Sequence, residues 1–299
     1  MITLLLGGLL AAVYFLLRVT ILKVPRCKSD AKLHEKTVVI TGWISSSTML
    51  VRILLSASTF RQENRLVWRK MFWCLSPGVL SDGQTDDGFG MMFGVNHLGH
   101  FLLTVLLLDR LKTSRPSRVV TVASNSYRRS KLDFSVLLDH RDSAVGSNYS
   151  QIYRKYCNSK LCNILFTCEL SRRLQGTNVT CYSLHPGQVT AANQLGILLY
   201  LYSVLGRYLG IWMKVFVMPF FYLLFMDPKS GAQTTLYCAL QQGIEHLSGH
   251  FFSRCTLQLN IGSKARDDAA ARKLWDLSES FCGLSKTHKL VSGDGSGFS

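Results

Sequence analysis

Arg118-Val-Val-Thr-Val-Ala-Ser124 is the stretch of sequence that decides the fold. Its run of β-branched and small apolar residues is typical of a strand buried on both faces of a parallel sheet. A serine stands at its carboxyl end, which is the edge where open α/β sheets bind their ligands. The stretch therefore predicts a central strand with a candidate functional residue, Ser124, at its end.

A segment with a tyrosine and a lysine at helical spacing follows this strand. In Tyr156-Cys-Asn-Ser-Lys160 the two side chains are four residues apart, so they share one face of a helix. Periodic apolar residues, a basic last turn and Gly176 predict that the helix ends near Leu174. A cation beside a phenol stabilises the phenolate and lowers its pKa, which suits general acid–base chemistry on a hydroxyl or carbonyl. An ordinary surface pair is the alternative interpretation.

Two further runs complete the pattern. Asn178-Val-Thr-Cys-Tyr-Ser-Leu184 leads into His185-Pro-Gly187, and Thr37-Val-Val-Ile-Thr41 leads into Gly42. Alternating strands and helices predict a Rossmann-like, doubly wound parallel α/β sheet. A first strand that enters a glycine turn is typical of a dinucleotide-binding unit. However, no further glycine follows Gly42 at the positions where the backbone should approach a pyrophosphate.

The region after the first strand is short for such a fold. Three strand–helix units ahead of a fourth strand need about 75–85 residues. Ile40 and Val79 lie only 39 positions apart. We therefore expect the N-terminal half of the cofactor-binding domain to be truncated and residues 43–77 to be atypical. The segment from Leu50 to Trp73 has no clean periodicity and predicts no definite structure.

The composition indicates a globular chain with basic surfaces. Hydrophobic residues make up 47% and charged residues 17% of the 299 residues, which excludes a disordered chain and allows one large domain or two. The net charge of +16 indicates either plain solvated lysines and arginines or attraction to an anionic membrane or cofactor. No basic run interleaved with aromatic residues occurs, so nucleic acid is not expected as a partner. Nine cysteines without Cys-x-x-Cys pairs predict free thiols rather than a zinc site or disulfides.

The first 23 residues predict an N-terminal membrane anchor helix. An apolar run from Ile2 to Leu17 is followed by Arg18 and Lys23, whereas a cleaved signal peptide carries its basic residues first. With Arg18 snorkelling, the usable length reaches about 20 residues, enough to span a bilayer. The positive-inside rule then places the remaining chain in the cytosol. A buried core helix is the alternative.

Four motifs in a fixed order resemble the short-chain dehydrogenase/reductase family, specifically its retinol-dehydrogenase-like branch. They are Val95-Asn-His-Leu-Gly-His-Phe101, Val119-Val-Thr-Val-Ala-Ser124, Tyr156-Cys-Asn-Ser-Lys160 and Leu184-His-Pro-Gly187. The resemblance runs from Gly78 to about Leu284 and includes the anchor and the first strand. It implies a domain over 36–284, followed by a flexible tail over 285–299.

The resemblance implies an NAD- or NADP-dependent oxidoreductase that interconverts a hydrophobic, retinoid- or steroid-like alcohol and its carbonyl compound. By resemblance, Tyr156 exchanges the proton, Lys160 lowers its pKa and binds the nicotinamide ribose, and Ser124 holds the substrate oxygen. Asn96 tethers a water in the proton relay, with a helix-capping or backbone-bonding role as the alternative. The implied cofactor-binding residues are Thr41, Gly42, Gly78, Lys160, Pro186 and Gly187.

The resemblance also implies partners and a location. We expect a hydrophobic small-molecule substrate and attachment to a membrane, that of the endoplasmic reticulum, with the domain facing the cytosol; a homodimer is compatible with the family. The apolar segment from Leu195 to Phe225 lines the substrate site or lies at the bilayer.

The phosphate-binding turn departs from the family pattern. The family's Thr-Gly-x-x-x-Gly-x-Gly is reduced to Thr41-Gly42, and its Asn-Asn-Ala-Gly aligns with Leu75-Ser-Pro-Gly78. Each lost charge-assisted bond to a phosphate is worth roughly 1.5–3 kcal/mol. The alternative function is therefore a catalytically inactive, membrane-associated interaction protein derived from this family.

Overall fold

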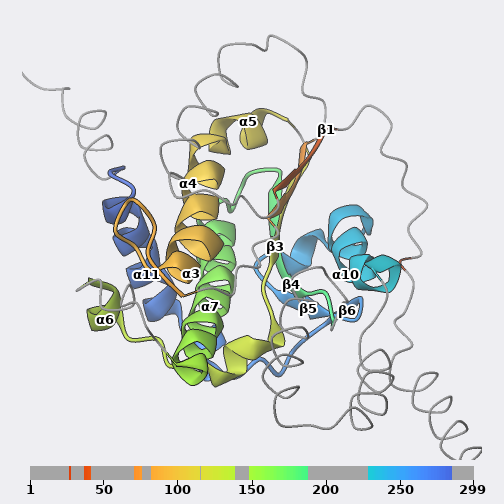
Figure 1. Cartoon of the computed structure of the whole chain (residues 1–299). Coiled ribbons are helices and arrows are strands. Elements are labelled where there is room, and N and C mark those ends of the chain that lie inside the picture. Colours follow the sequence, from red (N-terminus) through yellow and green to blue (C-terminus); the bar gives the residue numbers. More distant parts are fainter. Residues whose placement is uncertain are drawn as a thin grey trace, which may run out of the picture.

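The computed structural model of the chain describes residues 27, 37–41, 71–75, 82–114, 116–138, 148–187 and 228–284 (Figure 1). The expected anchor at 1–23, the apolar segment 195–225 and the expected tail at 285–299 lie outside these ranges. Gly42 and Gly78, two of the expected cofactor-binding residues, also lie outside them.

A six-stranded sheet forms the centre of the described part of the chain, in the order β1-β2-β3-β4-β5-β6. The first five strands run parallel to their neighbours, and β6 runs antiparallel to β5. Val122 pairs with Leu184, so the carboxyl ends of β3 and β4 are level. The Rossmann-like α/β prediction is confirmed at this level. The strands are β1 (Thr37–Thr41), β2 (Met71–Leu75), β3 (Ser117–Val122), β4 (Val179–His185), β5 (Phe251–Ser253) and β6 (Thr256–Leu257).

The order of the strands in the sheet follows their order in the chain. A doubly wound sheet contains a point where this order reverses, and no such reversal occurs among the described strands. Strand β1 instead pairs directly with β2, and only residues 42–70 connect the two. The sequence pattern did not indicate β2, although Met71-Phe-Trp-Cys-Leu75 is a short apolar run that ends at Ser-Pro-Gly.

Helices cover both faces of the sheet (Figure 1). Val119 and Cys181 pack with Phe101 and Phe166 on one face, whereas Val120 and Tyr182 pack with Cys238 of α10 on the other. This alternation explains why the strands are apolar without a break. The first face carries α3 (Met91–Phe93), η1 (Gly94–Leu98), α4 (Gly99–Leu106), α5 (Leu108–Thr113), α7 (Tyr149–Arg173) and α11 (Asp268–Phe281), and the second carries α10 (Pro228–Leu240).

Helix α7 is the long element that carries the tyrosine–lysine pair. It begins earlier than the motif indicated, because Asn148 caps it in a reciprocal pair of hydrogen bonds with Gln151. It ends at Arg173, and Gly176 adopts a positive φ of 79°, so the predicted end is confirmed. Because Tyr156 lies two turns inside the helix, its position is fixed by regular helical geometry.

Four short helical segments complete the described elements. They are η2 (Asn125–Arg129), α6 (Phe134–Leu138), η4 (Glu245–Leu247) and η5 (Ser263–Ala265). No helix within the described ranges is both long and apolar enough to cross a bilayer. Eight cysteines in these ranges are free thiols, as their spacing predicted.

Candidate active site

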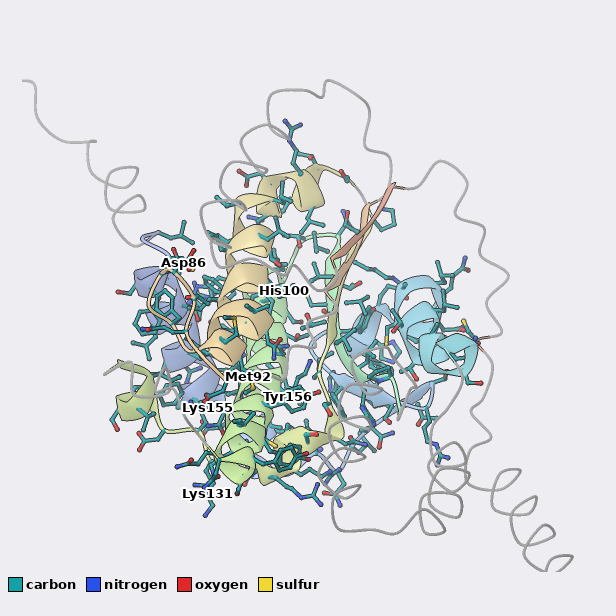
Figure 2. All side chains as sticks on the ribbon, in the orientation of Figure 1. Asp86, Met92, His100, Lys131, Lys155 and Tyr156 are labelled. Carbon is teal, nitrogen blue, oxygen red and sulfur yellow. The ribbon has the colours of Figure 1, made fainter. Side chains whose placement is uncertain are left out.

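Tyr156 and Lys160 lie together at the carboxyl edge of the sheet. Lys160 is buried, with 1% of its surface exposed, and its Nζ donates to the carbonyl of Val122 at 3.3 Å. The same nitrogen lies 5.4 Å from the centre of the Tyr156 ring. Figure 2 shows Tyr156 and the neighbouring Lys155 on different sides of α7. The pair is therefore not an ordinary surface pair, because the lysine is packed against the end of β3.

The electrostatics of this pair differ from the sequence expectation. Burial raises the pKa of Tyr156 to about 12, and a hydrogen bond with Ser124 acts in the opposite direction. Burial lowers the pKa of Lys160 to about 7. The expected lowering of the tyrosine pKa by a neighbouring cation is therefore wrong for the protein alone, since desolvation disfavours the charged form of both groups. Tyr156 consequently keeps its proton at neutral pH.

Ser124 lies two residues after the end of β3. Its Oγ accepts a hydrogen bond from the backbone N–H of Ser126 at 3.2 Å, which makes it the N-cap of η2. The Oγ atoms of Ser124 and Ser126 are 3.0 Å apart. Ser124 also lies near enough to Tyr156 to lower the pKa of its phenol.

Asn96 lies in η1, a π-helical segment, and is fully buried. Its Nδ2 donates to Ser159 Oγ at 3.1 Å, and Ser159 Oγ donates to the carbonyl of Tyr156 at 2.8 Å. Asn96 is therefore tied to the turn of α7 between the tyrosine and the lysine. A π-helical turn inside an α-helix is frequent at functional sites because it turns a side chain out of the regular helical order.

Polar residues that the motifs did not indicate surround this group. Asn163 Nδ2 donates to the same Val122 carbonyl as Lys160, at 3.5 Å. His100 bonds the carbonyl of Val95 at 3.0 Å, and burial lowers its pKa to about 4. Their spacing could have found them, since Asn163 is three residues after Lys160 and His100 is four after Asn96.

The described residues fit the nicotinamide end of a dinucleotide cofactor. Pro186 and Gly187 follow β4 at the same edge, and Gly187 has a positive φ of 96°, which favours glycine. His185 stands beside them, and its Nδ1 is buried without a hydrogen-bond partner among the described residues. Such an atom indicates a polar group that is absent from the protein alone. Burial lowers the pKa of His185 to about 4, with a further contribution from the charge of Lys160.

The phosphate end of the expected cofactor site is described only at Thr41. This residue ends β1, and its backbone pairs with Leu75 at the end of β2. Gly42 and Gly78 follow these two strand ends and lie outside the described residues. The structure therefore brings together Asn96, Ser124, Tyr156, Lys160, Pro186 and Gly187 at one edge of the sheet, with Thr41 at the end of β1.

A parallel sheet with helices on both faces, and with a buried lysine and a tyrosine at its carboxyl edge, places this chain in the Rossmann-like α/β class. A crystal structure of an uncharacterised protein from Mycobacterium paratuberculosis shares this fold, with a TM-score of 0.53 and 26% identity. The similarity covers 78% of this chain and 72% of that one. No protein-family model matches the chain.

Similarity to curated proteins is stronger. Dehydrogenase/reductase SDR family member 13 of Bos taurus is 39% identical over 327 residues, which cover 94% of this chain and 82% of that protein. Retinol dehydrogenase 14 of Homo sapiens is 45% identical over 210 residues, which cover 68% of this chain and 55% of that protein. The chain belongs to the short-chain dehydrogenase/reductase family, as the order of its motifs predicted.

Proposed function

We propose that this chain is an NAD- or NADP-dependent oxidoreductase that interconverts a hydrophobic alcohol and its carbonyl compound. The observation that carries the proposal is the buried Lys160, whose Nζ lies 5.4 Å from the centre of the Tyr156 ring, with Ser124 near enough to lower the pKa of that tyrosine. The names of its relatives, a dehydrogenase/reductase and a retinol dehydrogenase, support this reaction and favour a retinoid-like or steroid-like substrate.

In this proposal Tyr156 is the acid in the direction of reduction. It keeps its proton at neutral pH because burial raises its pKa to about 12. It gives this proton to the substrate oxygen, and Ser124 donates a hydrogen bond to the same oxygen. Lys160 is positively charged below about pH 7 and then attracts the phenolate that remains. The bound nicotinamide supplies the hydride.

The remaining residues have holding roles in the proposal. Lys160, Pro186 and Gly187 hold the nicotinamide ribose and ring, and Asn96 tethers a water of the proton relay. Support comes from the position of these residues at one edge of the sheet and from the unpartnered Nδ1 of His185 beside them. We assign the phosphates to Thr41, Gly42 and Gly78, which stand at or shortly after the ends of β1 and β2 in the sequence.

Cofactor binding is the first test. Energy transfer from tryptophan to NADH or NADPH would be measured on the detergent-solubilised full chain, followed by turnover with a hydrophobic aldehyde such as retinal. We expect micromolar binding, and we expect Tyr156→Phe to bind cofactor equally well but to turn over no substrate. Wild-type turnover in Tyr156→Phe would refute the assignment of the acid.

The second candidate is an inactive, membrane-associated interaction protein. Two observations favour it. Residues 42–70 leave room for about one strand-to-strand crossover, of roughly 30 residues. The alignment with dehydrogenase/reductase SDR family member 13 spans 327 residues and is longer than the 299-residue chain. The short connection supports a truncated cofactor-binding half, and the alignment length supports the presence in the relative of residues with no counterpart in this chain. Absence of cofactor binding up to millimolar concentration would favour this candidate over the enzyme.

We further propose that residues 1–23 anchor the chain in the endoplasmic reticulum membrane, with the domain at 36–284 facing the cytosol. The apolar run and the basic residues that follow it support this orientation. Protease protection of the C-terminal domain in sealed microsomes would contradict it. A homodimer is testable in the same preparation by cross-linking.

A further inference from the structure

A row of hydroxyl groups leads away from Tyr156 toward the protein surface. Ser124, whose hydroxyl lowers the pKa of Tyr156, has its Oγ 3.0 Å from that of Ser126. Tyr153 Oη donates to Ser126 Oγ at 3.4 Å, and Arg129 Nη1 donates to Tyr153 Oη at 3.5 Å. No role in the reaction proposed above has been given to Ser126, Tyr153 or Arg129.

The row becomes more exposed with distance from the sheet. Ser124, Ser126 and Tyr153 are half-buried, and Arg129 is exposed. The outermost group of the row is therefore in contact with water. The two serines lie at the start of η2, and Tyr153 lies on α7. The row therefore forms only where these two elements pack together.

A stack of three aromatic rings holds Tyr153 in place. Its ring lies 6.3 Å from that of Tyr156 and 6.3 Å from that of Tyr149, nearly parallel to both. Tyr149 ends the stack at the surface, with 46% of its area exposed. The three residues are three and four positions apart on α7, so they share one face of the helix. The stack therefore keeps the Tyr153 hydroxyl beside Ser126.

The hydrogen bonds of the row can all point inward. Tyr153 donates to Ser126, Ser126 is able to donate to Ser124, and Ser124 is able to donate to Tyr156. The bond with Ser124 lowers the pKa of Tyr156, as expected for a donor to the phenolate. Hydrogen bonds that point in this direction can deliver a proton from solvent to Tyr156 after it has lost its own proton.

We propose that Ser124, Ser126 and Tyr153 form a proton path that exchanges the Tyr156 proton with solvent. The inference rests on the proposed function in one respect, that Tyr156 passes a proton to the substrate oxygen. This path is separate from the Asn96 relay, because Asn96 approaches the site from η1 and bonds Ser159.

Each step of the path conserves atoms and charge. After Tyr156 gives its proton to the substrate oxygen, the O–H bond of Ser124 breaks as a new one forms on Tyr156. Ser126 then supplies Ser124, Tyr153 supplies Ser126, and water supplies Tyr153, leaving hydroxide that the buffer neutralises. No electrons move between groups, and in the direction of oxidation the same bonds form and break in reverse.

The contact between Tyr153 and Ser126 is longer than that between the two serines. At 3.4 Å this distance exceeds the usual range of about 2.5–3.0 Å for O–H···O bonds. A small side-chain movement must therefore shorten it before a proton passes. Arg129 donates a hydrogen bond to Tyr153, which stabilises negative charge on that oxygen as its proton leaves.

Hydroxyl exchange at Tyr156 tests the path without requiring turnover. With tyrosine labelled by ¹³C at Cζ, the isotope shift between H₂O and D₂O reports how fast the Tyr156 hydroxyl proton exchanges. We expect Tyr153→Phe and Ser126→Ala each to slow this exchange by about 10²-fold, the lower end of the effect of a positioned proton-transfer group. Tyr149→Phe is the matched control, since it removes a hydroxyl from the exposed end of the same stack and should leave the rate unchanged.

Turnover provides the second measurement. In Tyr153→Phe we expect kcat to fall, KM for the cofactor to stay constant and the solvent deuterium isotope effect on kcat to rise. Added imidazole should restore kcat by supplying protons from solution, which a merely structural defect would not allow. Exchange at the wild-type rate in both Tyr153→Phe and Ser126→Ala overturns the path. If the wild-type chain turns over no substrate, the proposed function fails, whereas the exchange rates still decide on the path.

Discussion

Lys160 should make the stability of this protein rise with pH. The pKa of Lys160 is about 7 in the folded chain, whereas its ordinary value, 10.5, applies to the unfolded chain. Between pH 7 and 10.5 the unfolded chain therefore holds a proton that the folded chain has lost. The free energy of unfolding should then increase by about 1.4 kcal/mol per pH unit, and by about 5 kcal/mol over the whole window. Stability is correspondingly lost as the pH falls from 10.5 to 7. The cause is burial, since 1% of the residue is exposed.

Lys160→Met isolates this contribution, because methionine fills similar volume and does not titrate. Urea unfolding in detergent at pH 7.5, 8.5 and 9.5 would give the slope of stability against pH for both proteins. We expect the slope of the variant to be lower by about 1.4 kcal/mol per pH unit. Tyr156→Phe should keep the wild-type slope in this range, since Lys160 remains and the tyrosine pKa lies at about 12. Equal slopes in the wild type and Lys160→Met would refute the reasoning that burial sets the lysine pKa.

Three further substitutions test the site and its support. Ser124→Ala removes the hydroxyl that lowers the pKa of Tyr156 and, on the proposed function, should lower kcat by about 10²–10³-fold with little change in cofactor affinity, measured by steady-state kinetics. Asn148→Ala breaks the reciprocal cap of α7 and should lower the free energy of unfolding by about 1 kcal/mol, with Asn148→Asp retaining most of it. Trp275→Ala removes the indole that packs 4.9 Å from Phe101 and should cost about 3–5 kcal/mol, so an unchanged denaturation midpoint would contradict the packing described.

The parts of the fold that depend on local patterns were predictable from sequence. Thr37–Thr41, the strand before Ser124 and the end of the Tyr156 helix each carry their own signal, namely β-branched runs and a glycine stop. Strand β2 was not predicted, because Met71–Leu75 is a short run in a part of the sequence without clean periodicity. Its strand conformation depends on pairing with β1 and β3. Its periodicity alone cannot distinguish a strand from a buried turn of helix.

The members of the site were predictable, but their electrostatics were not. Spacing along the chain showed that Tyr156 and Lys160 share a helix face, and spacing carries no information about burial. Because Lys160 packs under the end of β3, desolvation determines both pKa values and reverses the expected shift of Tyr156. The unpartnered nitrogen of His185 is likewise a property of the tertiary structure.

The π-helical turn at Gly94–Leu98 makes the direction of the Asn96 side chain sensitive to the number of residues in that turn. A wide turn holds one more residue than the α-helical turns around it, and each residue of an α-helix advances the chain by about 100° around the axis. Deleting a single residue between Gly94 and Leu98 would therefore let the segment relax to an uninterrupted α-helix while rotating Asn96 out of line with Ser159. The helix would survive such a deletion, and the asparagine would be lost to the site. Angular phase along one helix, rather than the shape of a loop, thus determines whether Asn96 reaches Ser159.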